Sequence, residues 1–394
     1  MLETDQPSRL SVFDLLPRTD KEPKKRSESR FEYLNRSDTL ASERMCGQID
    51  RWYAEYPDDG RHELRQRFRS GNDRDFDSAL HELVLHALAK ALGCELRLHP
   101  DLQGSSKHPD FILESSPHCN TYLEAVNPTD LSPEEEGAEK RKGAVLDGLD
   151  DLDMQDFGVG ITQRRTGKQP LSQKRLRSRV KEILQSLDPA TLADKLSSGG
   201  IEALPRFSLH EDDWELELTV MPKSTPGGRL IGVEMTEVHK IDTTSPLRAG
   251  LKRKAGRYGE LNLPYIIAVN SNNMSSDHIS IVEALYGTEQ IGVIRVADGY
   301  KEVFSRARNG LWMSGNGPQY TRVSGVLFTR QLSTSNLMQN AEALLYLNPW
   351  ASRPYSGELE QLGTKVLKEN SLCTHAGRPL HEVLNIDLSW PGCD

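Results

Sequence analysis

The segment from Phe76 to Gly93 is the feature that most constrains the fold of this 394-residue chain. Apolar residues recur there at helical spacing and end at Ala91, which predicts a buried helix. Gly93 then supplies a residue suited to the left-handed conformation that ends many helices. Three short strand-like segments follow this helix, at 94–100, 109–114 and 121–126.

Three acidic side chains fall on these predicted elements. Glu82 lies beside the apolar stripe of the helix, Asp110 opens the second strand segment, and Glu124 lies within the third. Adjacent strands joined by a turn can bring two carboxylates within bridging distance of one cation. Mg²⁺ prefers carboxylate oxygens and keeps several waters, and it can polarise a scissile phosphate and lower the pKa of its bound water. The acids therefore predict a hydrolytic metal site.

The succession of FDSALHELVLHALAKALG, PDFILE and YLEAV resembles the PD-(D/E)xK nuclease superfamily, which includes many restriction and repair enzymes. It also resembles a group of uncharacterised bacterial proteins with similar ELxLH…LG and PDF segments. The resemblance covers about the first half of the chain. It implies that Glu82, Asp110 and Glu124 hold a metal, Mg²⁺ or Mn²⁺, and that a lysine activates or orients the attacking water.

The sequence departs from the superfamily at the position of that lysine, which is Val126. A valine side chain can neither donate nor accept a hydrogen bond, so the amine must come from a neighbouring element. The candidates are Lys140 and Lys142 on the following helix, and Lys107 just before Pro109. Asn127 is a weaker substitute, because an amide can orient a water but cannot act as a base. If no amine reaches the acids, the domain is a binding remnant.

The acids also have ordinary structural explanations. Glu82 could simply pair with Arg97, and a Pro-Asp pair often just starts a strand, because proline is tolerated at a first strand position. Glu124 is harder to explain in this way, since an unpaired carboxylate between buried strand residues is costly.

Two basic helices are candidates for contacts with a nucleic-acid backbone, because lysine and arginine neutralise phosphates. The residues are Lys174, Arg177 and Lys181 in the predicted helix 172–187, and Lys252 and Lys254 in the predicted helix 246–258. Each helix could equally be an amphipathic surface helix with a solvated basic face. The formal net charge of −9 disfavours non-specific coating of nucleic acid but leaves room for a local basic cleft.

Strands and helices continue to alternate through the second half, which predicts an α/β fold. We expect a mixed central sheet flanked by helices, with a restriction-endonuclease-like core and an α/β C-terminal extension. The predicted parts are a flexible N-terminal arm at 1–40, a nuclease-like domain at 41–200, and an extension or second domain at 201–394. The extension either packs on the same sheet or folds separately.

Bulk properties indicate a cytoplasmic protein. The sequence contains no apolar run of the ~20 residues that a membrane-spanning helix needs, and its N-terminus lacks the apolar core of a secretory signal. The five cysteines are scattered and show no CxxC spacing, which argues against a structural zinc site or a disulfide framework.

The leading hypothesis is a metal-dependent phosphodiesterase that acts on DNA, in defence or DNA processing. The alternative is a catalytically inactive nuclease-like module that binds nucleic acid or a protein partner. A homodimer is a further expectation for either function.

Overall fold

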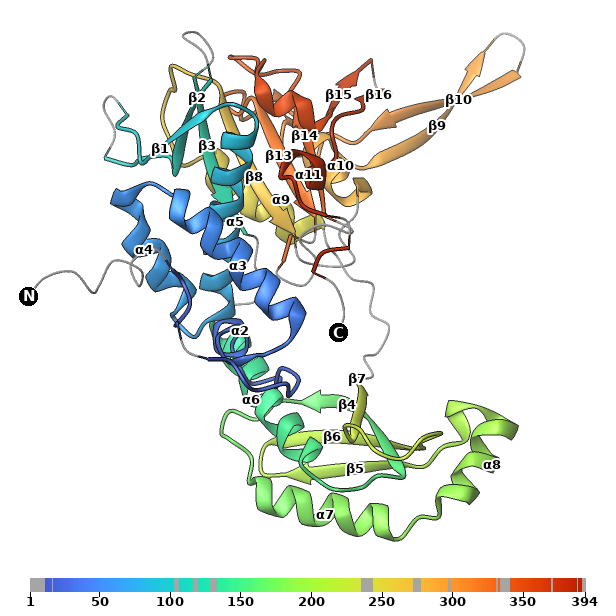
Figure 1. The fold of residues 1–394 in the computed structure, drawn as a ribbon. Helices are drawn as coiled ribbons and strands as arrows, with labels where there is room; N and C mark the ends of the chain where they lie inside the picture. The colour runs from blue at the N-terminus through green and yellow to red at the C-terminus, as the bar shows by residue number, and fades with distance from the viewer. Residues whose placement is uncertain are drawn as a thin grey trace, which may run out of the picture. The chain divides into compact units, whose positions relative to one another are not determined.

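The computed structural model divides the chain into two compact units (Figure 1). The first unit comprises Met1–Glu22, Arg30–Asp130 and Ile241–Asp394, and the second comprises Pro23–Ser29 and Leu131–Lys240. The residues that the structure describes are 11–15, 17–102, 106–115, 120–127, 133–234, 244–271, 278–296, 299–330, 332–333, 341–369, 371–387 and 389–391.

An eight-stranded sheet forms the centre of the first unit. Its strands, in spatial order, are β1 (Glu95–Leu98), β2 (Phe111–Glu114), β3 (Thr121–Val126), β8 (Tyr265–Ser271), β13 (Gly325–Arg330), β14 (Glu342–Leu347), β15 (Thr364–Lys368) and β16 (Ser371–His375). Strands β1, β2 and β3 form an antiparallel meander, whereas β3, β8 and β13 run parallel. The predicted mixed sheet is therefore confirmed.

Helices cover both faces of this sheet (Figure 1). On one side α5 (Asp73–Ala91) and η2 (Glu358–Leu362) pack on the sheet, and α2 (Arg30–Arg36), α3 (Leu40–Glu55) and α4 (Asp58–Phe68) pack on α5, with α11 (Leu380–Val383) in the same apolar cluster. On the other side α9 (Thr244–Ala255) packs on the sheet, with α10 (His278–Tyr286) in the same apolar cluster. We call the two apolar layers the α5-side core and the α9-side core. Side chains alternate between them along each strand, so Leu123 joins the α5-side core while Tyr122 and Val126 join the α9-side core.

Local sequence explains the helix and the strand at the heart of the unit. The side chain of Asn72 accepts a hydrogen bond from the backbone of Arg74 at the start of α5, and Gly93 takes a φ of 82° just after its end. Strand β8 is buried along its whole length, as expected for a parallel strand with helices on both faces.

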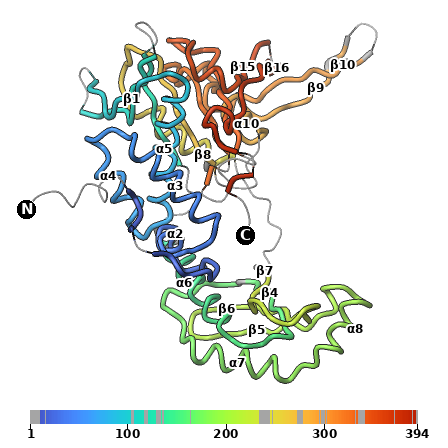
Figure 2. Tube along the Cα trace, viewed as in Figure 1, coloured from blue at the N-terminus to red at the C-terminus, as the bar shows by residue number. Residues whose placement is uncertain are grey.

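The second unit has its own four-stranded sheet, in the order β5 (Arg206–Glu211), β6 (Trp214–Pro222), β4 (Phe157–Arg165) and β7 (Ile231–Glu234). Its helices are α6 (Pro133–Asp150), α7 (Gln173–Gln185), α8 (Pro189–Gly199) and the short η1 (Ile201–Ala203). Leu146, Val180 and Leu218 belong to a separate apolar core. The chain enters this unit after β3 and returns to the first unit before α9 (Figure 2).

This division differs from the predicted parts at 1–40, 41–200 and 201–394. Strand β4 pairs with β6 across residue 200, and β3 pairs with β8, so the second half shares both sheets with the first. Near the N-terminus, Val12 and Phe13 are buried in the α5-side core, and α2 follows within the part predicted to be a flexible arm.

In the C-terminal third, β14, β15 and β16 extend the main sheet. Two further hairpins pair β9 (Glu289–Val296) with β10 (Gly299–Arg306), and β11 (Met313–Ser314) with β12 (Gly317–Pro318). Among the described helices, none combines the length and the apolar character needed to cross a bilayer.

The central sheet predicts a large stability effect at Leu327, which is fully buried on β13 in the α5-side core. Leu327→Ala should lower the free energy of unfolding of the first unit by about 2–5 kcal/mol, because it removes buried methyl groups and leaves a cavity. Urea denaturation followed by circular dichroism measures this loss. The control is Leu15→Ala, since Leu15 is 69% exposed and should change stability little; equal effects would contradict the assignment of Leu327 to the core.

Candidate active site

Asp110 and Glu124 lie next to each other where β2 and β3 pair. The register places Phe111 opposite Leu123, so Asp110, one residue earlier, adjoins Glu124 on the neighbouring strand. The backbone N–H of Asp110 donates to Oε2 of Glu124 at 3.3 Å, and the N–H of Ala125 donates to Oδ2 of Asp110 at 2.8 Å. The structure therefore brings together these two predicted acids.

Glu124 is completely buried, and its carboxylate is bound by groups from α9 and the residues just after it. Lys254 Nζ and Arg257 Nη1 both donate to Oε1, the latter at 2.8 Å, and form ion pairs with it. The Tyr258 hydroxyl lies 2.6 Å from Oε2 and 2.7 Å from the carbonyl oxygen of His108. Together with the N–H of Asp110, these contacts match the roughly four acceptor positions of a carboxylate.

The electrostatics of the site centre on Asp110. Burial and the neighbouring Glu124 charge raise the pKa of Asp110 to about 7, while the Lys254 ammonium opposes this rise. This raised pKa brings Asp110 toward the range where a carboxyl group can exchange a proton or accept a cation near neutral pH. Burial and the contact with Glu124 also raise the pKa of Tyr258, so its hydroxyl stays protonated.

The amine next to the acids is Lys254, which the sequence placed only among the nucleic-acid contacts. Of the amines predicted for this role, Lys140 and Lys142 lie on α6 of the second unit, and Lys142 pairs with Glu139 at 3.6 Å. Lys107 donates instead to the carbonyl oxygen of Arg257 at 3.3 Å. Within the described residues, the amine that contacts these acids comes from α9, whereas the catalytic role predicted for Lys140 and Lys142 stays a prediction.

The position of Lys254 in its helix carries a sequence signal for a buried partner. Leu251 and Ala255 are buried on the inner face of α9, and Lys254 lies between them at helical spacing, so only 19% of its side chain is exposed. The ammonium group of a lysine beside an apolar stripe must either extend to solvent or pair with a buried acid. Val126 lies in the same α9-side core, so α9 covers the sheet face where the motif's lysine would stand.

Glu82 does not join Asp110 and Glu124 in one cluster. Both of its oxygens accept hydrogen bonds from the Arg67 guanidinium on α4, at 2.6 and 2.5 Å. Arg97, the partner considered from the sequence, pairs with Glu114 instead. The charge of Glu82 still contributes to the raised pKa of Asp110, so it acts on the site through space.

Of the three acids predicted to hold a metal, the structure brings together Asp110 and Glu124, and Glu82 is bound by Arg67 instead. Among the described residues, no group of three or more His, Cys, Asp or Glu side chains is placed to hold a metal ion. Mg²⁺ is commonly bound by one or two carboxylates with waters and substrate phosphates completing its shell. Oδ1 of Asp110 accepts no hydrogen bond from the described chain, whereas Glu124 could join only if one of its donors moved.

The predicted nucleic-acid contacts fall on both units. On α7 of the second unit, Lys174 and Lys181 are exposed, while Arg177 pairs with Asp151 and donates to the carbonyl oxygen of Gly148. Leu176 and its apolar neighbours pack inward, as expected for an amphipathic surface helix. On α9, Lys252 is exposed and Lys254 turns inward to Glu124.

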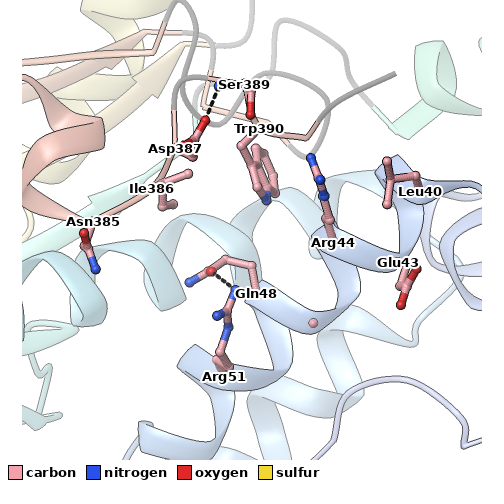
Figure 3. Close-up of a pocket in the computed structure, with 11 residues that line it drawn as sticks. Leu40, Glu43, Arg44, Gln48, Arg51, Asn385, Ile386, Asp387, Ser389 and Trp390 are labelled. Carbon is pink, nitrogen blue, oxygen red and sulfur yellow. Dashed lines mark hydrogen bonds between the residues drawn. The ribbon is translucent and has the colours of Figure 1, made fainter. Parts of the chain in front are cut away.

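A separate hollow of about 560 Å³ lies between α3 and the C-terminal segment (Figure 3). Arg44, Gln48 and Arg51 line it from α3, and Asp387 and Trp390 line it from the other side. None of the predicted site residues borders this hollow, so it is distinct from the pair of acids.

The arrangement predicts how two substitutions move the titration of Asp110. Lys254→Met should raise its pKa above about 7, because the opposing positive charge is removed, and Glu124→Gln should lower it, because the neighbouring negative charge is removed. NMR titration of the Asp110 carboxyl carbon measures both shifts. Lys252→Met, on the exposed face of α9, is the matched control; a pKa that fails to move in opposite directions would refute the proposed coupling.

Comparison of the chain with protein-family models, with curated proteins and with solved structures gave no match. The functional argument therefore depends on the chemistry of Asp110, Glu124 and the groups that surround them.

Proposed function

We propose that the protein is a metal-dependent phosphodiesterase acting on DNA, and that helix α9 supplies the amine missing from β3. The observation that carries this proposal is the contact of Lys254 with Glu124 directly beside Asp110. Two acids and an amine meet there although Val126 occupies the usual place of the amine. The order of a helix followed by three strands, α5 then β1, β2 and β3, supports the same reading.

The metal would be held by Asp110 and Glu124. Bound there, Mg²⁺ or Mn²⁺ would polarise the scissile phosphate and make water more acidic. Asp110 offers Oδ1, which accepts no hydrogen bond from the part of the chain that the structure describes, and a pKa that a nearby cation would lower. Glu124 offers its carboxylate once Lys254 or Arg257 exchanges to another partner.

The remaining groups of the site have roles that follow from their chemistry. An ammonium released from Glu124 can orient a water or neutralise charge on a phosphate, which is the task of the motif's lysine. The side chain of Arg257 is 40% exposed, so the N–H groups of its guanidinium can bind a phosphate oxygen while the side chain remains near Glu124. Tyr258 stays neutral and fixes the position of Oε2.

Positive charge near the site supports a nucleic-acid substrate. Lys252 and Arg253 are exposed on α9, one turn or less from Lys254. A local cluster of this kind can attract a phosphate backbone even though the chain as a whole is acidic. DNA rather than RNA is proposed from the resemblance to restriction and repair enzymes.

A second candidate function is a nuclease-like module that binds without catalysis. The observation that favours it is the full set of donors on Glu124, because a carboxylate already neutralised by Lys254 and Arg257 has less need of a metal. Metal binding distinguishes the two functions, since the enzyme requires a cation and the module does not.

The raised pKa of Asp110 predicts a pH-dependent metal affinity. A cation binds the deprotonated carboxylate, so affinity should be highest above about pH 7 and fall by up to about tenfold per unit below it. Isothermal titration calorimetry with Mn²⁺, carried out above and below about pH 7, measures the change in affinity. The variant Asp110→Asn should bind weakly at every pH; wild-type protein that binds no Mn²⁺ at high pH would favour the binding module.

Catalysis is tested by nicking of supercoiled plasmid with Mg²⁺ or Mn²⁺. Asp110→Ala should abolish nicking, and Lys254→Met should slow it by about 10²-fold or more, the usual contribution of a proton-transferring or orienting group. Lys252→Met is the matched control on the same helix and should nick at nearly the wild-type rate at saturating DNA. A wild-type protein that nicks no DNA, or a Lys254→Met variant as active as Lys252→Met, would contradict the mechanism.

A further inference from the structure

The hairpin formed by β9 and β10 is unusual among the strands of the first unit. Its two strands pair over their full length, from Glu289 opposite Arg306 to Val296 opposite Gly299. Within the described residues it joins no other sheet, and it extends from the body of the unit as a separate ribbon (Figure 1). An isolated two-stranded hairpin is only marginally stable in water and needs packing on one face.

One face of this hairpin carries large apolar side chains that are exposed to water. Ile291, Val293, Phe304 and Tyr300 have exposed fractions of 63%, 64%, 55% and 77%. Alternation along each strand puts all of them on the same side, with Ile291 directly opposite Phe304. The other side alternates small or polar residues, such as Gly292 and Ser305, with β-branched ones such as Val303, and Val303 is only partly exposed. An exposed apolar face of this kind is typical of an interaction surface.

The charges on the apolar face favour a second copy of this chain. The face also carries two acids, Glu289 and Glu302, and two bases, Arg295 and Arg306, so its net charge is zero. The side chain of Arg306 is only 10% exposed and pairs with Glu289 of its own hairpin at 3.6 Å, which leaves Arg295 as the exposed base. A nucleic-acid surface would need a net positive face. A twofold interface instead needs a pattern that complements itself, with residue i meeting j and j meeting i.

The positions along the strands meet this requirement. A twofold axis across the hairpin, midway between the level of Ile291 and that of Val293, brings Ile291 opposite Val293 of the second copy. The same axis brings Arg295 opposite Glu289 of the second copy. Phe304 meets the aliphatic stem of Glu302, which can cover an aromatic ring while its carboxylate stays in water.

We propose that the β9–β10 hairpins of two copies pack face to face about this axis, and that the protein is a homodimer. The hairpin is then a dimerisation arm, and the exposed apolar side chains form the centre of its interface. Each charged pair occurs twice, once on either side of the axis.

The oligomeric state tests the proposal. In sedimentation velocity, the wild-type chain should sediment with twice the mass of a single chain, and Phe304→Asp should sediment as a monomer. The variant Val303→Asp, on the opposite face of the same strand, controls for general damage to the hairpin and should stay dimeric. A monomeric wild type at micromolar concentration overturns the proposal, and so does a dimer that Phe304→Asp leaves intact.

A charge-reversal experiment tests the predicted axis itself. In the Arg295→Glu variant, the introduced carboxylate should face Glu289 of the second copy, so the dimer should dissociate. In the Glu289→Arg variant, the introduced arginine should face Arg295 of the second copy, so this dimer should dissociate as well. Mixed in equal amounts, the two variants should form a heterodimer, because each contact then joins opposite charges. If both single variants remain dimeric, or if the mixture stays monomeric, the face-to-face arrangement is wrong.

Discussion

The burial of the Glu124 carboxylate is the constraint on which the site depends. Moving an ionised carboxylate out of water costs several kcal/mol, and the cost is offset only by opposite charge and hydrogen bonds of good geometry. Lys254, Arg257 and Tyr258 supply these, and all three come from α9 or the turn that follows it. The packing of α9 on the α9-side core is therefore inseparable from the chemistry of the site.

The same constraint explains the behaviour of Asp110. Two carboxylates side by side cannot both be ionised cheaply, and Glu124 already holds the available cations. Asp110 consequently keeps its proton to near neutral pH. A divalent cation would relieve this repulsion, which connects the structural role of the pair with the proposed phosphodiesterase activity.

The sequence that builds the first unit is interrupted by the residues of the second compact unit. Between β3 and α9 the chain builds a four-stranded sheet of its own and then returns to complete the first unit. Strand β8 next to β3 and helix α9 above it thus come from a part of the sequence more than a hundred residues beyond the acids they serve. The proposed dimerisation arm follows further along, between α10 and β13.

Periodicity and local chemistry were sufficient to predict α5, the strand segments that became β1, β2 and β3, and the position of Asp110 and Glu124 on adjacent strands. Each depends on residues close together in the sequence. The source of the amine was different, because the contact of Lys254 with Glu124 joins residues 130 positions apart, and only the packing of α9 decides it. Glu82 likewise does not join the two acids, because its carboxylate is bound by Arg67 of another helix. Sequence determined which elements could carry a site, whereas tertiary structure decided which charges meet, because a buried charge is satisfied by whichever partner the fold brings to it.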